Sequence, residues 1–312
     1  MKTETKKQIV EALESYLTLH GISQNEIAKK SGVNVSYVSA MRGGQTEINA
    51  GKQMVEISTK WYELIADFIG FKLVKTYWHT VETPQMVSIL ATLQDAKQYG
   101  YTNVIIGETG GGKSFIADLF AKKNPVDTYI ITISQSDNIG DLLDKVLDAI
   151  KIPTSKTKSK KLRSIVSYLK ALKLQGNKPM LIFDEAEYMK QPALCAMKEL
   201  YDNLNGICSI IMIGTDQLIK NIERLKKRNK DGIPQLYRRI KFGIRVLPFI
   251  DRTFKQFLNG ISDKGLIRFL RENCDNYGEL HDCLVPAMRE ADRTGQVLSE
   301  QFVRTVLNIP NN

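Results

Sequence analysis

The residues best suited to chemistry form a glycine-rich run, GETGGGKS at 107–114, which follows an apolar stretch and opens a helical pattern. The run fits G-x-x-x-x-G-K-[ST], in which backbone N–H groups curl around nucleotide phosphates. Glycines permit that curl, and the helix that follows turns its positive end towards the phosphates. Lys113 can reach the phosphates, and Ser114 can place its hydroxyl on Mg²⁺. The expected nucleotide-binding residues are Gly107, Glu108, Thr109, Gly110, Gly111, Gly112, Lys113 and Ser114.

A second run, MLIFDE at 180–185, places two acids at the end of an apolar strand. Asp184 would join Ser114 as a ligand of Mg²⁺, and Glu185 would polarise the attacking water. A strand that ends in two acids is common by itself, but here it follows a phosphate loop. The two motifs together predict a site that binds ATP with Mg²⁺ and hydrolyses it.

Further along the chain, the strand ICSIIMIG ends at Thr215. In ATPases of the AAA+ type, which this order of motifs resembles, such a strand lies between those carrying the loop and the acids. Thr215 would then face the γ-phosphate or the water, although it and Asp216 could instead cap the next helix.

Two arginines, Arg238 and Arg239, stand in LYRRIKF at 236–242, at the end of a predicted helix. Phosphoryl transfer gains from an arginine that meets the developing charge, often from a neighbouring subunit. Arg239 is the preferred residue for this role, and the alternative for either arginine is a solvated basic face.

Strands and helices alternate from about residue 85 to 250, which predicts a mainly parallel sheet covered by helices on both faces. The expected fold class is α/β: an AAA+ P-loop ATPase with a C-terminal helical lid and an N-terminal all-α helix-turn-helix domain. The predicted boundaries are 1–70 for the helix-turn-helix domain, 71–84 for a linker, 85–250 for the ATPase core and 251–312 for the lid.

The segment 24–44, QNEIAKKSGVNVSYVSAMRGG, fits a helix-turn-helix. Ala28 stands where two helices cross and only a small side chain fits, and Gly32 occupies the turn. The second helix would present polar side chains to a DNA major groove. The alternative is a small helical bundle used for protein contacts. The candidate DNA-contacting residues here are Asn34, Ser36, Tyr37 and Arg42.

The net charge of +10 over 312 residues favours a polyanionic partner. The basic residues gather in two stretches, which would follow the backbone of double-stranded DNA without sequence preference, unless they are only solvated faces. The first stretch holds Lys151, Lys156, Lys158, Lys160, Lys161 and Arg163, and the second holds Arg224, Lys226, Lys227, Arg228 and Lys230.

Other features limit where the protein works. No apolar run is long enough to span a bilayer, and the first residues lack the apolar core of a signal peptide, so we expect a cytoplasmic protein without a membrane partner. The four cysteines show no C-x-x-C spacing, which favours small buried side chains over a zinc site or a disulfide framework.

Over nearly its whole length the chain resembles the target-selecting transposition ATPases of the bacteriophage Mu B type. The likeness includes TVETPQMVSIL, GETGGGKS, LIFDEAEYM, IMIGTDQL, LYRRIKF and YGELHDCLVPAMREA. It implies ATP-dependent assembly of a homo-oligomeric helical filament on DNA, and delivery of that DNA to a partner transposase that stimulates hydrolysis. Two departures stand out: Thr215 replaces an asparagine, and His281 stands where many AAA+ lids have an arginine.

Three other functions fit parts of the sequence. An ATP-switched transcription regulator would use the helix-turn-helix to read an operator. A helicase-loader-like AAA+ protein would bind a replicative helicase. A pure assembly scaffold would bind ATP and barely hydrolyse it.

Overall fold

The computed structural model describes residues 3–50, 53–71 and 77–310. The chain divides into two compact units, Met1–Thr76 and Tyr77–Asn312. The division falls inside the segment expected to be a linker (71–84), of which residues 72–76 lie outside the described residues. Residues 77–84 belong to the second unit.

Short helices dominate the first unit, and they pack on one apolar core. Ile9, Leu13 and Leu17 form the buried stripe of the first helix, as its spacing predicts. Gly32 adopts φ 72° in the turn between the second and third helices, where the absence of a Cβ avoids strain. The elements are α1 (Thr3–His20), α2 (Gln24–Ser31), α3 (Val35–Arg42), β1 (Glu47–Ala50), β2 (Gln53–Glu56) and α4 (Thr59–Phe68).

The prediction that this unit is all-α is wrong at β1 and β2, which pair antiparallel with Ile48 opposite Val55. The pair continues where Ile57 N–H donates to Thr46 O at 2.8 Å. Each strand has only four residues, and β2 (QMVE) does not alternate polar with apolar side chains, so the strand signal in the sequence is weak.

A five-stranded parallel sheet forms the centre of the second unit, in the order β4-β5-β6-β3-β7. β6 therefore lies between the strand that precedes the glycine loop and the strand that ends in the acids, as predicted. The strands are β3 (Thr102–Ile106), β4 (Thr128–Thr132), β5 (Met180–Asp184), β6 (Ser209–Gly214) and β7 (Ile244–Val246).

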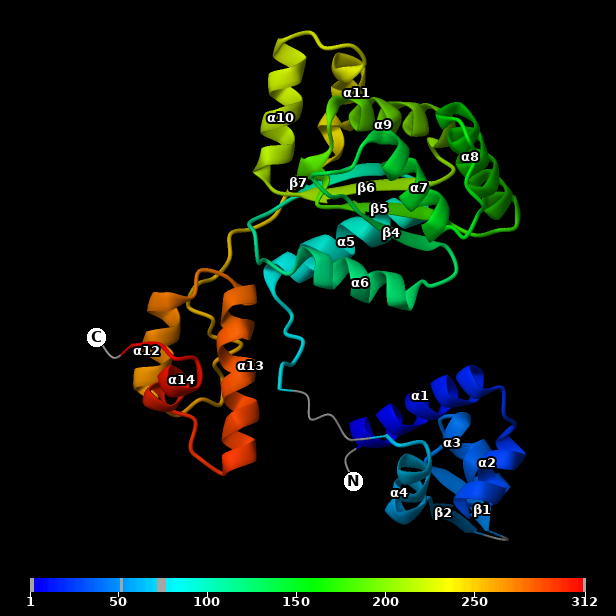
Figure 1. The fold of residues 1–312 in the computed structure, drawn as a ribbon, viewed down its shortest axis with the longest axis vertical. Coiled ribbons are helices and arrows are strands. Elements are labelled where there is room, and N and C mark those ends of the chain that lie inside the picture. Colours follow the sequence, from blue (N-terminus) through cyan, green and yellow to red (C-terminus); the bar gives the residue numbers. More distant parts are fainter. Residues whose placement is uncertain (1–2, 51–52, 72–76, 311–312) are drawn as a thin grey trace. The chain divides into compact units, whose positions relative to one another are not determined.

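Successive side chains of the central strands point to opposite faces of the sheet, and they are apolar on both faces. Helices therefore cover both faces. Met180 and Ile182 face α5 (Pro84–Tyr99) and α6 (Lys113–Lys123). Leu181 and Phe183 face the opposite layer. Figure 1 shows the helices of that layer across the strands from α5 and α6. That layer contains α7 (Ile139–Ala149), α8 (Lys158–Leu174), α9 (Gln191–Leu204), α10 (Asp216–Lys227) and α11 (Ile233–Ile240). Two short 3₁₀ helices, η1 (Ala186–Tyr188) and η2 (Lys241–Gly243), complete the core.

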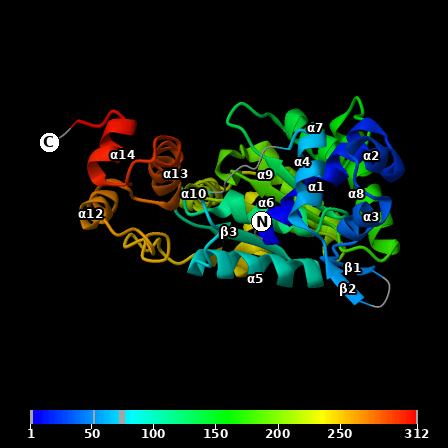
Figure 2. The ribbon, with the colours of Figure 1, turned by 90° about the horizontal axis from the view of Figure 1, so that it is seen from below.

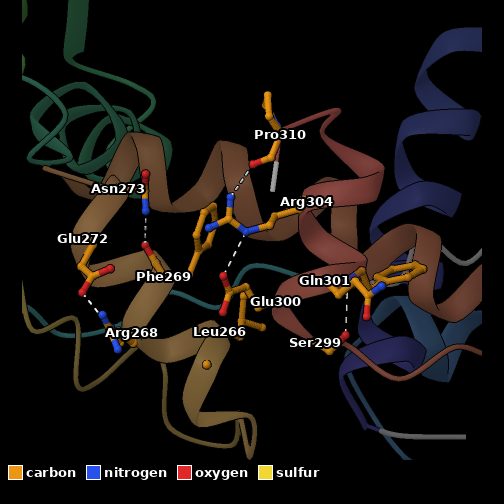
Figure 3. A network of polar contacts seen from close by, with 12 residues as sticks. Leu266, Arg268, Phe269, Glu272, Asn273, Ser299, Glu300, Gln301, Arg304 and Pro310 are labelled. Atoms are coloured by element: carbon orange, nitrogen blue, oxygen red, sulfur yellow. Dashed lines mark hydrogen bonds and ion pairs between the residues drawn. The ribbon is translucent and has the colours of Figure 1, made fainter. Parts of the chain in front are cut away.

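The lid consists of α12 (Lys264–Asn273), α13 (Tyr277–Thr294) and α14 (Glu300–Val306), grouped beside the sheet (Figure 2). Arg304 of α14 donates to Glu300 at 2.9 Å and to Pro310 O at 2.8 Å. Its guanidinium lies 4.4 Å from the centre of the Phe269 ring, which ties α14 to α12 (Figure 3).

Among the helices that the structure describes, none combines the length and the apolar character needed to cross a membrane.

Candidate nucleotide site

The glycine loop joins β3 to α6, and its backbone is shaped as the motif requires. Gly110 and Gly112 adopt φ 70° and 80°, the left-handed region that other residues occupy only at a cost. Lys113 Nζ folds back over the loop and donates to Gly107 O at 3.0 Å and Glu108 O at 2.7 Å. Burial lowers the pKa of Lys113, and neighbouring carboxylates oppose this shift. The loop thus holds its lysine ready for phosphate oxygens.

The lid meets the same loop at the start of α13. Gly278 N–H donates to Gly110 O at 3.3 Å. A Cβ on Gly110 would lie 2.1 Å from Asn276 Oδ1, so only glycine permits this approach. Glu108, predicted to bind nucleotide, instead directs its carboxylate to Ile250 N–H at 3.0 Å and to Arg252 at 3.4 Å. The side chain of Glu108 anchors the lid connector, while its backbone remains in the loop.

The two predicted acids stand at the end of β5, and both line a cavity that the glycine loop also lines. Asp184 is buried, and its Oδ1 accepts a hydrogen bond from Glu185 N–H at 3.0 Å. Glu185 adopts φ 57°, a left-handed conformation that costs a non-glycine residue about 1–2 kcal/mol. Partial burial, together with Glu187 and Asp184, raises the pKa of Glu185. Such strain and such a shift are typical of functional positions.

Thr215 lies at the end of β6 on the same cavity, together with a residue that the sequence did not suggest. Thr215 occupies the N-cap position of α10, yet its hydroxyl makes no capping hydrogen bond. Its N–H donates to Glu187 Oε1 at 3.3 Å. The only sequence signal for Glu187 was a third acid two residues beyond the predicted pair.

A cavity of about 580 Å³ unites these residues with the lid. At the lid end, Trp78 stacks on Phe257 with ring centres 4.9 Å apart, and His281 meets Trp78 edge-on at 5.1 Å. Tyr277 packs 5.1 Å from Phe257. Sequence reasoning treated the segment around Trp78 as a connector and missed this aromatic wall. His281 lines the cavity at the lid end, and none of the described residues that line the cavity is an arginine.

Oxygen atoms suited to Mg²⁺ are present at the phosphate end. Ser114 and Asp184 both line the cavity, and hydroxyl and carboxylate oxygens are the hard ligands that this ion prefers. No cluster of three or more His, Cys, Asp or Glu side chains able to hold a metal occurs among the described residues. The residues therefore fit an ion that takes its other ligands from phosphates and water.

The two predicted arginines lie at the end of α11, outside the residues that line the cavity. Arg239 is mostly buried, and its Nε donates to Asp202 at 2.6 Å. Arg238 is exposed, without a partner in the described part of the chain. Arg239, the residue preferred from the sequence, is thus the one that already pairs with a side chain of its own subunit.

The basic stretches lie at separate places on the ATPase unit, at the start of α8 and the end of α10. Lys161 is held by Asp144 at 2.5 Å, and Lys226 lies 3.6 Å from the centre of the Tyr237 ring. Arg224 is exposed and donates to Asn221 at 2.8 Å. The other eight predicted contacts are exposed: Lys151, Lys156, Lys158, Lys160, Arg163, Lys227, Arg228 and Lys230.

On α3 and at its N-cap, all four predicted DNA contacts have intramolecular partners. Asn34 caps the helix by accepting from Ser36 N–H at 3.0 Å. Tyr37 stacks on Trp61 at 5.3 Å, and Arg42 forms an ion pair with Glu14. Ser36 is exposed, but its hydroxyl also donates to the Asn34 side chain.

The sequence predicted small buried side chains for all four cysteines, and two of them are buried. Cys208 and Cys274 are buried, Cys195 and Cys283 are partly buried, and all four are free. Burial raises the pKa of the Cys208 thiol to about 12.

Comparison with known proteins supports the fold. Residues 97–222 match the family model described as an AAA domain. The Mu-like prophage FluMu DNA transposition protein B of Haemophilus influenzae is 24% identical over 216 residues, which cover 67% of this chain and 70% of that protein.

Two solved structures share this fold. Cdc6p of Pyrobaculum aerophilum aligns with a TM-score of 0.54 and 14% identity over 75% of this chain and 69% of that one. The Aeropyrum pernix ORC2 protein, solved as ADPNP–ADP complexes, gives a TM-score of 0.50 and 16% identity over 71% of this chain; the alignment spans just under two thirds of ORC2, at 66%. The chain therefore contains an AAA domain and has the AAA+ fold, and over about two thirds of its length it is similar to a Mu-like transposition protein B.

Proposed function

We propose that this protein binds ATP with Mg²⁺, assembles on double-stranded DNA in that state, and delivers the DNA to a partner transposase. The observation that carries the proposal is the convergence of the glycine loop, the β5 acids and Thr215 on one cavity. The likeness to a transposition protein B supports the DNA and transposase parts.

Each end of the cavity fits one part of ATP. The aromatic wall around Trp78 and Phe257 offers flat apolar surface to the base. The loop amides and Lys113 would bind the phosphates, and Asp184 with Ser114 would hold Mg²⁺, which would supply positive charge beside the phosphate oxygens. Glu185 accepts a proton from the attacking water. At the same time the water oxygen bonds to the γ-phosphorus, and the bond between the γ-phosphorus and ADP breaks.

Arg238 is the arginine that a neighbouring protomer would supply. It is exposed at the end of α11, whereas Arg239 is occupied by Asp202. A second copy of the chain that places Arg238 against the γ-phosphate would couple hydrolysis to assembly. None of the described residues that line the cavity is an arginine, so the rate of hydrolysis would depend strongly on an arginine from the neighbouring protomer.

DNA affinity in this proposal comes mainly from the ATPase unit. Residues 1–71 carry eight Lys and Arg against eight Asp and Glu, so the net charge of +10 comes from the rest of the chain. Repetition of the exposed lysines at the start of α8 along a filament would neutralise successive phosphates with little sequence preference. The first unit would add at most a modest preference, because Tyr37 and Arg42 are engaged within it.

Electron microscopy of the protein with duplex DNA tests the proposal. We expect continuous filaments with ATP, none without nucleotide, and none with the Lys113→Ala variant. A single bound complex at one sequence, independent of ATP, would contradict assembly and favour an operator-reading regulator.

A further inference from the structure

Glu187 occupies an unusual position just beyond the predicted acids. Because Glu185 takes a left-handed conformation, the chain turns sharply after β5 and enters η1. This turn brings Glu187 back against the end of β6, where its Oε1 accepts the N–H of Thr215 at 3.3 Å. Glu187 is thereby held at the cavity wall rather than directed to solvent.

The neighbouring strand leaves space for this carboxylate. A Cβ on Gly214 would lie 2.5 Å from Glu187 Oε2, closer than such atoms approach. Gly214 is not among the residues with positive φ, so its backbone does not require glycine. The lack of a side chain at Gly214 therefore serves the position of Glu187.

Two oxygen atoms at this point lack partners. Within the described residues, Glu187 Oε2 and Thr215 Oγ1 are buried and accept or donate no hydrogen bond. Each such atom costs about 1–3 kcal/mol unless a polar group satisfies it. Both residues line the nucleotide cavity, so a group bound there can satisfy these atoms once the side chains turn towards it.

We propose that Glu187 is a catalytic residue, whose Oε2 joins Thr215 Oγ1 in holding the attacking water in line with the γ-phosphate. This role of Glu187 rests on the proposed ATP hydrolysis. One O–H of the water donates to Glu187, and the second proton passes to Glu185 as the new O–P bond forms and the bond to ADP breaks. Two carboxylates thus divide the work, one orienting the water and the other accepting its proton.

The test compares Glu187→Gln with Glu199→Gln, which removes an exposed charge from α9 away from the cavity. In Glu187→Gln the amide oxygen of the new side chain can still accept from Thr215, but its NH₂ replaces the free acceptor. We expect kcat to fall about 100-fold. The Kd for ATPγS, measured by calorimetry, should stay within about twofold. Binding of ADP with aluminium fluoride, which mimics the transition state, should weaken at least 10-fold by the same method.

A second variant, Gly214→Ala, displaces Glu187 without altering any acid. The conflict involves only the flexible end of Glu187, so the fold should tolerate it. We expect a similar loss of kcat, and no further loss in the double variant with Glu187→Gln. Equal turnover and aluminium fluoride binding in Glu187→Gln and wild type would overturn the assignment, as would loss of ATPγS binding in Glu187→Gln. Failure of wild type itself to bind ATPγS would instead overturn the proposed function.

Discussion

The carboxylate of Glu108, inside the phosphate loop, accepts a hydrogen bond from the backbone N–H of Ile250, where the chain leaves the sheet for the lid. On the other side of this connector, the buried Gln85 amide donates to Phe249 O at 2.7 Å and accepts from the Tyr277 hydroxyl at 3.1 Å. The loop, α5 and the lid are thus joined through one short segment. A ligand bound by the loop therefore lies next to the segment that carries the lid.

Substitution of Glu108 should distinguish its hydrogen bond with Ile250 N–H from its ion pair with Arg252. Glu108→Ala leaves Ile250 N–H without its acceptor, so we expect a loss of about 1–2 kcal/mol in the free energy of unfolding. The Kd for ATP should rise several-fold. Glu108→Gln keeps the acceptor and loses only the half-exposed pair with Arg252, worth well under about 1 kcal/mol. Denaturant titration and calorimetry measure both effects; equal behaviour of the two variants would refute the role of the hydrogen bond with Ile250 N–H.

The aromatic wall should account for recognition of the base. Trp78→Ala removes the ring stacked on Phe257, and loss of a base–aromatic stack costs about 1–3 kcal/mol. We expect the Kd for ATP to rise roughly 10-fold or more, whereas Trp78→Phe should remain close to wild type. Inorganic triphosphate offers a control, since it lacks a base and should bind both variants equally. A similar loss for triphosphate would place Trp78 in the fold rather than at the base.

The central sheet was predictable because its signals are local. An apolar run before GETGGGKS and another before Asp184 identify strands. Which strands are neighbours was implied by the resemblance to AAA+ ATPases. The N-terminal pair β1–β2 was missed, because Ile48 and Val55 offer only two apolar residues in register. Pairing between such short strands is decided by contacts that sequence periodicity does not report.

Site residues whose positions depend on tertiary contacts were harder to predict from the sequence. Glu187 reaches the cavity only because Glu185 turns the chain, and nothing in DEAE signals a left-handed residue there. Arg238 and Arg239 are adjacent and chemically alike, so only the contact with Asp202 distinguishes them. Such contacts join residues far apart in the chain.

The two arginines should behave differently. Arg238→Ala should leave ATP binding and the free energy of unfolding near wild type, yet reduce turnover of the assembled protein at least about 10-fold. Arg239→Ala breaks a mostly buried pair with Asp202 and should cost about 1–2 kcal/mol of stability, with turnover per folded molecule preserved. Turnover assays on DNA and thermal melts distinguish the two. If Arg239→Ala is inactive and Arg238→Ala is active, the assignment is reversed.

DNA binding should depend on exposed lysines of α8 and not on Lys161, which Asp144 already holds. The double variant Lys158→Glu with Lys160→Glu should weaken ATP-dependent binding to duplex DNA and reduce the salt slope of log K by about two. The matched control reverses Lys122 and Lys123, two exposed lysines of α6 on the opposite face of the sheet.

Fluorescence anisotropy over a range of salt concentrations measures these slopes. An unchanged slope in the α8 variant, or an equal loss in the α6 control, would remove α8 from the interface.

The most direct test of the whole account is calorimetric titration of the purified protein with ATP and Mg²⁺, alongside Lys113→Ala. Lys113 lies over the glycine loop with two carbonyl contacts, and we expect one ATP per chain in wild type and at least about 100-fold weaker binding in the variant. If wild type shows no binding heat across several temperatures, or if Lys113→Ala binds ATP equally well, the cavity is not the nucleotide site.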